Sequence, residues 1–167
     1  GVINWAESDQ ECYEWTVEII QKADEYLAQH DKGELTFGGI RYPELNESAR
    51  RSTLVEILPW LRGQVSSDKR LVATVQDDEM MRYFVNSEDV VRLSELGTSC
   101  PDHFLRTKIK PMYVPWDPHH QSLGDLKELI LEGLDRYRQD YSAYYKRCKH
   151  DDSPALRNTN PSILLIP

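Results

Sequence analysis

A long amphipathic segment between two short apolar runs constrains the fold of this chain more than any other feature. From Leu123 to about Cys148, apolar and aromatic residues recur at helical spacing along one side: Leu126, Ile130, Leu134, Tyr137, Tyr141 and Tyr144. The flanking runs, residues 109–114 and 162–166, are typical of short strands. Since strands joined by a helix usually lie parallel in one sheet, the sequence predicts an α/β fold. We expect a helical N-terminal part followed by a small, Rossmann-like parallel sheet layered with helices.

The first part of the chain is predicted to be helical. Residues 8–30 begin with Ser8 and Glu11 at the spacing of a capping box. One face carries apolar residues that we expect to pack in a core: Cys12, Trp15, Ile19, Ala23, Tyr26 and Leu27.

A second helix is expected over residues 46–64, after a glycine-rich loop. Its predicted buried side consists of Leu54, Ile57, Leu58 and Leu61. Pro59 should kink or end this helix, because proline has no N–H and clashes with the preceding turn. Gly63 is the expected stop.

The character of the sequence changes near Ser66. Residues 69–75 form a short β-branched run that predicts a buried strand. Short helices are expected over residues 77–85 and 88–96, the second capped by Ser87 and ended by Gly97. We therefore divide the chain into an N-terminal piece (1–31), a connector with a helix (32–66) and an α/β domain (67–167).

Charge and cysteine content exclude several classes of partner. The net charge is −8, from 28 acidic and 20 basic residues, which disfavours binding to nucleic acid or to anionic membranes. No apolar run reaches the ~18 residues that cross a bilayer, and no signal peptide is evident. Three cysteines at scattered positions do not form a disulfide framework, so a cytoplasmic protein is expected.

Candidate functional side chains are concentrated in residues 97–118. Cys100 is a candidate reactive thiol, because a nearby cation from His103 or Arg106 would lower its pKa. Alternatively, Arg106, Lys108 and His103 bind a phosphate or carboxylate. A third interpretation is an ordinary short helix, capped by Ser99 and running to residue 107.

Common catalytic motifs are missing from the sequence. It contains no GxGxxG, no GxxxxGK[ST], no GxSxG, no HxH and no CxxC. No catalytic residue and no metal ligand is therefore assigned.

Three segments carry a resemblance to a known family: GVINWAESDQECYEWTVEIIQKADEYL, FVNSEDVVRLSELGTSCPDHFLRTK, and YSAYYKRCK followed by NPSILLIP. In this order they resemble the middle of bifunctional bacterial enzymes, described as rhamnulose-1-phosphate aldolase/alcohol dehydrogenases. These enzymes join a class II (adducin-type) aldolase module to a C-terminal short-chain dehydrogenase. The resemblance covers nearly the whole chain.

The resemblance implies an internal fragment of a sugar-degrading enzyme. Residues 1–31 would end the aldolase module, with a metal-binding histidine just before Gly1, and the α/β domain would be truncated at its C-terminal end. The complete protein would use a divalent metal, zinc, to stabilise an enediolate during aldol cleavage, and NAD(P) to oxidise an aldehyde or alcohol product. Neither active site, and neither cofactor, would lie in this fragment, which should be inactive alone.

The expected partners are the other two modules of the same chain, a small sugar-derived substrate and, as one alternative, a second copy of the chain. A competing hypothesis is a non-catalytic α/β module for ligand binding or subunit assembly. A free-standing thiol enzyme that uses Cys100 and His103 is a third.

Overall fold

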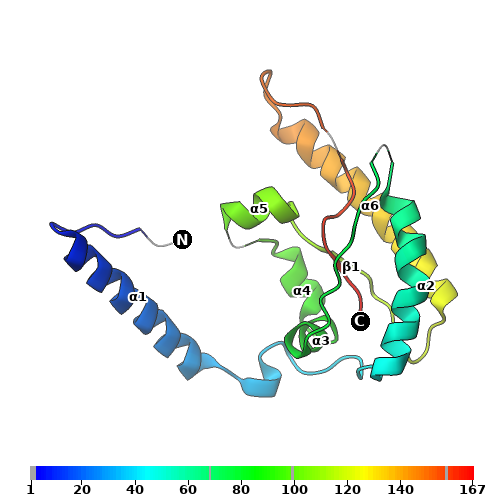
Figure 1. The fold of residues 1–167 in the computed structure, drawn as a ribbon, viewed down its shortest axis with the longest axis horizontal. Coiled ribbons are helices and arrows are strands. Elements are labelled where there is room, and N and C mark those ends of the chain that lie inside the picture. The colour runs from blue at the N-terminus through cyan, green and yellow to red at the C-terminus, as the bar shows by residue number, and fades with distance from the viewer. Residues whose placement is uncertain (1–2, 68, 99, 157) are drawn as a thin grey trace.

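The computed structural model describes residues 3–67, 69–98, 100–156 and 158–167 (Figure 1). In chain order its elements are α1 (Asp9–His30), the 3-10 helix η1 (Gly33–Leu35), α2 (Glu47–Val65), α3 (Glu79–Val85), α4 (Val90–Glu95), α5 (Pro101–Thr107), β1 (Met112–Tyr113), α6 (Leu123–Cys148) and β2 (Leu164–Leu165). The α/β class is confirmed, with a helical first part and a small parallel sheet packed against helices.

The sheet consists of β1 and β2, which lie parallel and are connected through α6. Met112 pairs with Leu164, and Tyr113 pairs with Leu165. The Met112 N–H donates to the Ile163 carbonyl and the Val114 N–H donates to the Leu165 carbonyl, both at 2.9 Å. Both strands lie inside the predicted runs but are shorter than expected.

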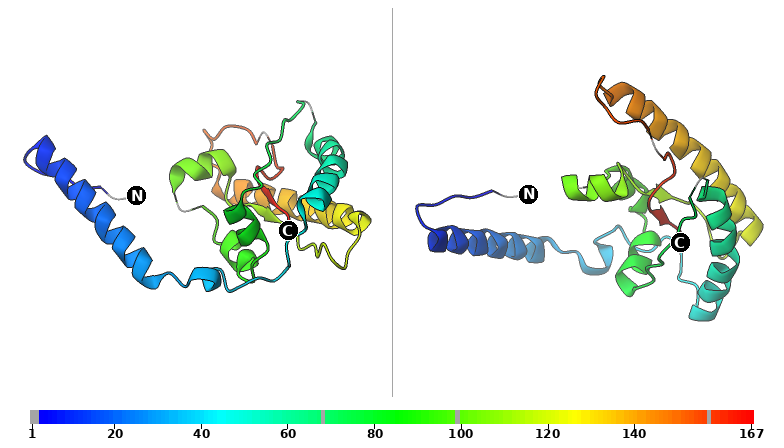
Figure 2. Two further views of the ribbon diagram at one scale, coloured as in Figure 1. Left: turned by 60° about the horizontal axis from the view of Figure 1, so that its bottom comes forward. Right: turned by 45° about the horizontal axis from the view of Figure 1, so that its top comes forward.

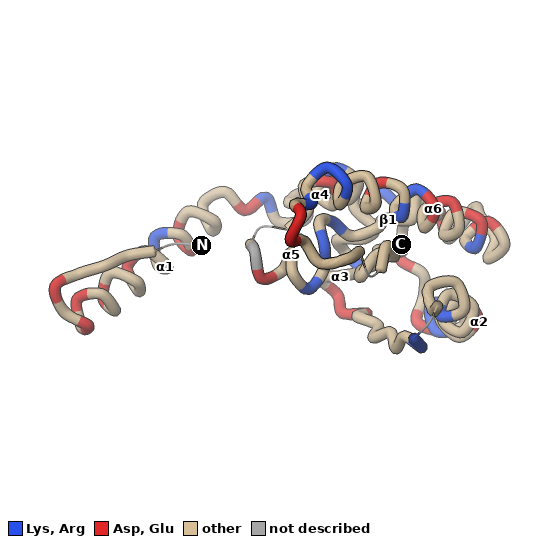
Figure 3. The backbone as a smooth tube through the Cα atoms, turned by 90° about the horizontal axis from the view of Figure 1, so that it is seen from above, with Lys and Arg blue, Asp and Glu red and all other residues tan. Residues whose placement is uncertain are grey.

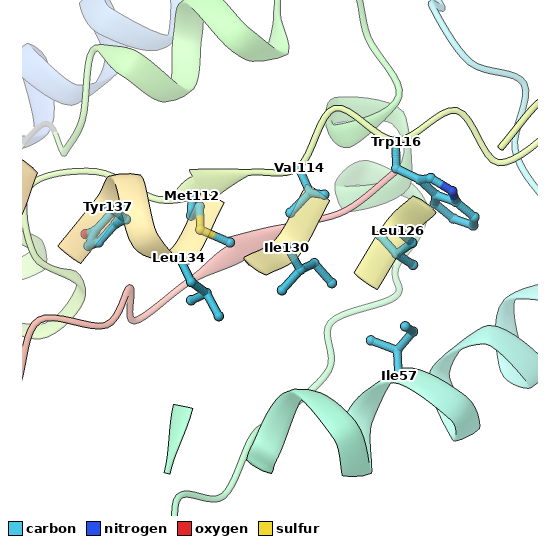
Figure 4. Close-up of a cluster of buried hydrophobic side chains, with 8 residues drawn as sticks. All are labelled: Ile57, Met112, Val114, Trp116, Leu126, Ile130, Leu134 and Tyr137. Atoms are coloured by element: carbon cyan, nitrogen blue, oxygen red, sulfur yellow. The ribbon is translucent and has the colours of Figure 1, made fainter. Parts of the chain in front are cut away.

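The core forms where α6 packs against the sheet (Figure 4). The face predicted for α6 supplies four buried side chains, at 0 to 6% exposure: Leu126, Ile130, Leu134 and Tyr137. Met112 and Val114 from the β1 region, Trp116 from the following loop and Ile57 from α2 complete the cluster. The helical period of the sequence therefore located the largest contribution to the core.

Pro59 does not end α2, which was one of the two outcomes predicted for it. The helix continues to Val65 with Pro59 inside it, and Gly63 is not its stop. Pro59 and Val55, four residues earlier, are both exposed, so water can solvate the carbonyl that proline leaves without an N–H donor. Of the predicted buried side, only Ile57 is fully buried, while Leu54, Leu58 and Leu61 are partly exposed.

The prediction that the apolar face of α1 packs in a core is wrong for this chain. Ser8 caps the helix by accepting a hydrogen bond from the Glu11 N–H at 3.2 Å, as predicted. However, α1 has no buried residues, and it extends away from the other elements (Figures 1 and 2). Leu27 is 67% exposed, and Trp15 and Tyr26 also face solvent. Asn4 contacts this face at Cys12, but no other described helix or strand buries it, which is why the helical period did not lead to burial.

The strand predicted at residues 69–75 is also absent from the structure. Residues 71–78 form neither helix nor strand and pair with no strand among the described residues, and Val72 is 88% exposed. Helices do follow, as α3 and α4, and Gly97 takes a positive φ of 77° after α4. Ser87 is not a helix cap. It is buried, and its Oγ donates to the Phe84 carbonyl at 2.8 Å.

No helix among the described residues is long and apolar enough to cross a membrane. α4 and α6 each carry both acidic and basic residues, whereas α1 carries mainly acidic ones (Figure 3).

Candidate functional site

The predicted site segment forms α5, a helix of 7 residues. Pro101 stands at its first turn, as predicted, and Cys100 occupies the N-cap position with extended backbone. The proposed cap Ser99 lies outside the described residues. Cys100 is partly buried, free of any disulfide, and its side chain makes no capping hydrogen bond. The interpretation as a short helix is therefore confirmed, while the reactive thiol stays a prediction.

His103 and Arg106 lie on the exposed surface of α5. Within the described residues, neither side chain has a polar partner, and only the His103 carbonyl is used, accepting from Thr107 Oγ1 at 2.7 Å. Both side chains are therefore accessible to a ligand from outside this chain. Their role in anion binding stays a prediction.

Lys108 is placed differently from the other two candidates. Its backbone has a φ of 65°, and its Nζ donates to the Asn158 carbonyl at 2.8 Å and to the Asn160 carbonyl. The same ammonium lies 4.5 Å from the centroid of the Tyr141 ring, an attractive cation–π distance. Burial lowers the pKa of Lys108. The Lys108 side chain thus anchors the loop before β2, and its donors are directed at protein carbonyls.

Asn160 and Arg138 form a polar junction beside this anchor, which the sequence analysis did not predict. Arg138 Nε donates to Asn160 Oδ1 at 2.7 Å, and Asn160 Nδ2 donates to the Val65 carbonyl at 2.9 Å. Arg138 also donates to the Gln64 carbonyl at 2.9 Å. The last carbonyls of a helix lack intrahelical donors, so this junction satisfies the end of α2 and ties it to α6. A lone asparagine before a proline gives no sequence signal for such a contact.

A cavity of about 770 Å³ opens on the other side of β2. One wall is α2, with Leu54, Ile57 and Leu61, and the others are residues 71–77 and residues 161–167. Ion pairs lie at its rim: Arg50 Nε with Asp77 at 3.3 Å, and Arg82 Nε with Glu44 at 2.9 Å. The cavity is large enough for a small ligand, and two of its lining cations, Arg50 and Arg82, are already paired with carboxylates.

The described residues offer no cluster of ligands for a divalent metal and no free helix N-terminus of the kind that binds a dinucleotide. Among the described residues, no three His, Cys, Asp or Glu side chains are grouped so that they could hold a metal ion. Among the described elements, α6 is the long helix that follows a strand, and a capping box between Ser122 and Asp125 occupies the N–H groups of these two residues. The Asp125 carboxylate would repel a pyrophosphate at that helix end. No step of a reaction is therefore assigned to either cofactor within this chain.

Comparison with known proteins defines the class to which this fold belongs. Residues 52–167 match the family described as "Aldolase class II, second domain". The match begins within α2 and continues through β2, so the chain belongs to this family. The resemblance drawn from the sequence is confirmed at the level of class II aldolases.

A relative extends the comparison to the whole chain. The protein named "Uncharacterized oxidoreductase YuxG", from Bacillus subtilis (strain 168), is 35% identical over all 167 residues. The aligned region covers 24% of that relative, so the chain spans about a quarter of its length. No solved structure matches the chain.

Proposed function

We propose that this chain is the part of a bifunctional enzyme that connects an aldolase module to an oxidoreductase module. One observation carries the proposal. The same chain belongs to the class II aldolase second-domain family and is 35% identical along its full length to a protein named as an oxidoreductase. About three quarters of that relative lies outside the aligned region, which leaves room for both catalytic modules there.

The proposed reactions are metal-dependent cleavage of rhamnulose-1-phosphate, or a related sugar phosphate, and NAD(P)-dependent oxidation of an aldehyde or alcohol product in the cytoplasm. Zinc and NAD(P) would bind to modules outside this chain. The role assigned to the chain is structural: α6, β1 and β2 form a packed unit between the two modules. The α5 surface with His103 and Arg106 is available to the neighbouring module or to an anionic intermediate.

The test uses the complete gene product. Its coding sequence should specify a histidine before Gly1, an HxH pair further upstream and a glycine-rich dinucleotide motif downstream. The purified protein should cleave rhamnulose-1-phosphate in a reaction that EDTA abolishes, and should reduce NAD⁺ or NADP⁺ with the aldehyde product. The isolated chain should do neither. Absence of both activities from the complete protein, or of those flanking motifs, would overturn the proposal.

A second candidate function is subunit assembly, and the exposed face of α1 favours it. Trp15, Tyr26 and Leu27 are 51%, 62% and 67% exposed along one helix, and such contiguous apolar surface often marks an interaction site. If α1 pairs two copies, Leu27→Glu should convert the complete protein from a dimer to a monomer in sedimentation velocity. An unchanged sedimentation coefficient would remove this candidate.

A further inference from the structure

Residues 71–75 have the composition of a strand without its pairing. The sequence Leu-Val-Ala-Thr-Val is rich in β-branched residues, which favour a pleated and half-buried surface. In the structure the segment forms neither helix nor strand and runs a drawn-out path between α2 and α3 (Figure 1), and Val72 and Val75 are 88% and 46% exposed. The side chains of Val72 and Val75 therefore remain in contact with water.

β2 offers an edge where such a strand can bind. The carbonyls of Ile163 and Leu165 face β1, since they accept hydrogen bonds from Met112 and Val114. Because N–H and C=O groups alternate in direction along a strand, those of Leu164 and Ile166 point away from β1. Over the described residues, these four groups have no hydrogen-bond partner. An unpaired edge of this kind is a template for another strand.

The segment and the β2 edge face each other across one cavity. Residues 71–77 and residues 161–167 both line it, together with the apolar side of α2. Both segments run from the upper to the lower part of Figure 1, so they point in the same direction. Direct pairing would therefore be parallel, like the pairing of β1 with β2. It would also remove apolar cavity surface from water.

Both ends of the segment are held in place. At one end the Leu71 N–H donates to Ser66 Oγ at 3.2 Å. At the other end Asp77 forms ion pairs with Arg50 and Arg82. Between these two anchors, residues 72–76 make no hydrogen bond within the described part of the chain. The middle of the segment can therefore shift across the cavity without releasing either end.

From these contacts we propose that residues 71–75 close onto the outer edge of β2 as a third parallel strand. Closure fills the cavity between α2 and β2, covers the unpaired groups of Leu164 and Ile166, and buries the side chains of residues 71–75 that face α2. We call residues 71–75 the strap. The structure shows its open position, and the three-stranded sheet is its closed position.

Hydrogen exchange with mass spectrometry on the complete protein tests the closure. In the closed sheet, peptides covering residues 71–76 and residues 162–167 should both contain amides that exchange at least about tenfold slower than unpaired backbone. Free exchange in residues 71–76 would overturn the proposal. If residues 162–167 were protected in that case, the β2 edge would be covered by a different segment or by a second copy.

Proline substitutions separate strand pairing from general burial. Ala73→Pro and Thr74→Pro each remove one backbone N–H, and one of these two neighbours must face β2. One of the two variants should lose the protection of residues 162–167, while Ala73→Ser and Thr74→Ser, which keep the N–H, should retain it. Retained protection in both folded proline variants would overturn the proposal. If a proline variant fails to fold, the hydrogen exchange of residues 71–76 in the unsubstituted protein still tests whether the third strand forms.

Discussion

Arg138 Nε donates a hydrogen bond of 2.7 Å to Asn160 Oδ1, and through this contact α6 holds the loop that leads into β2. The same asparagine side chain donates to the Val65 carbonyl at the end of α2. One side chain therefore connects three parts of the fold that lie far apart in the sequence.

Removal of the Asn160 side chain should destabilise the fold. Asn160→Ala leaves the partly buried Arg138 guanidinium without one acceptor and the Val65 carbonyl without a donor. Losing partners in this way costs about 1–3 kcal/mol of the free energy of unfolding, measurable by urea denaturation. Gln139→Ala on the exposed side of α6 is the control and should leave stability within experimental error. Equal urea midpoints of unfolding for Asn160→Ala and Gln139→Ala would show that the Asn160 junction does not stabilise the fold.

Two glycines should respond to alanine with opposite signs. Gly97 has a φ of 77°, and an added Cβ would collide with the Ile109 carbonyl oxygen. Gly97→Ala should therefore lower the free energy of unfolding by about 1–3 kcal/mol. Gly63 lies inside α2 with open space around it, so Gly63→Ala should raise it by about 0.5–1 kcal/mol. Thermal unfolding of both variants tests this prediction. A change in stability of the same sign in Gly97→Ala and Gly63→Ala would contradict it.

Tyr137, which is buried, and Tyr113, which is half-buried, should make the fold less stable at alkaline pH. Burial raises the pKa of Tyr113 and of Tyr137 from 10.0 to about 12. Between pH 10 and 12 the unfolded chain loses these protons first, so the free energy of unfolding should fall as pH rises through this window. Tyr137→Phe and Tyr113→Phe should each make that decline shallower in urea titrations.

At neutral pH the same two variants should differ from each other. The Tyr137 hydroxyl donates to the Lys110 carbonyl at 2.9 Å, so Tyr137→Phe should cost about 1 kcal/mol. The buried Tyr113 hydroxyl has no partner among the described groups. Tyr113→Phe should therefore be neutral or stabilising, and a loss as large as that of Tyr137→Phe would contradict the contact assignment.

Charge reversal on α5 tests the predicted anion site. If Arg106 holds an anionic group of the substrate, Arg106→Glu in the complete protein should lower kcat/KM by roughly tenfold or more, because a charge-assisted contact becomes repulsive. Arg136→Glu, an equally exposed position on α6, is the matched control. Unchanged kinetics in a stable Arg106→Glu protein would end the anion-site hypothesis. Lys108 is unsuitable for this test, since its charge anchors residues 158–160.

Alkylation rates should rank the cysteines by exposure. Cys148 is exposed and Cys100 is partly buried, so iodoacetamide at pH 7 should modify Cys148 first. Mass spectrometry of timed samples gives the order. Faster modification of Cys100 than of Cys148 would instead support the reactive-thiol hypothesis from the sequence.

Local signals in the sequence were sufficient for the helices that end in standard caps. Ser8 and the apolar period of residues 123–148 located α1 and α6, because capping and helical spacing depend on neighbours within a few residues. Burial did not follow in the same way. The apolar face of α1 has the spacing of a core helix, but burial requires a covering surface, and no described residue provides one.

Predictions that depended on distant contacts were less successful. The β-branched run at residues 69–75 is equally compatible with a paired strand and with an extended strap, since only the partner edge distinguishes them. Lys108 is close in sequence to His103 and Arg106, yet its positive φ and its two carbonyl acceptors, about fifty residues later, direct it into the fold. Sequence proximity could not reveal those acceptors.

The pairing of Met112 with Leu164 has a consequence for synthesis of the protein. Contacts between residues so far apart in sequence form slowly, because a long loop must close before they contribute. During translation, β1 therefore cannot pair with β2 until all of α6 and then β2 have left the ribosome. Throughout that interval the apolar side chains of residues 112–116 have no sheet to join, and the nascent chain would be a natural client for a chaperone that binds short hydrophobic segments.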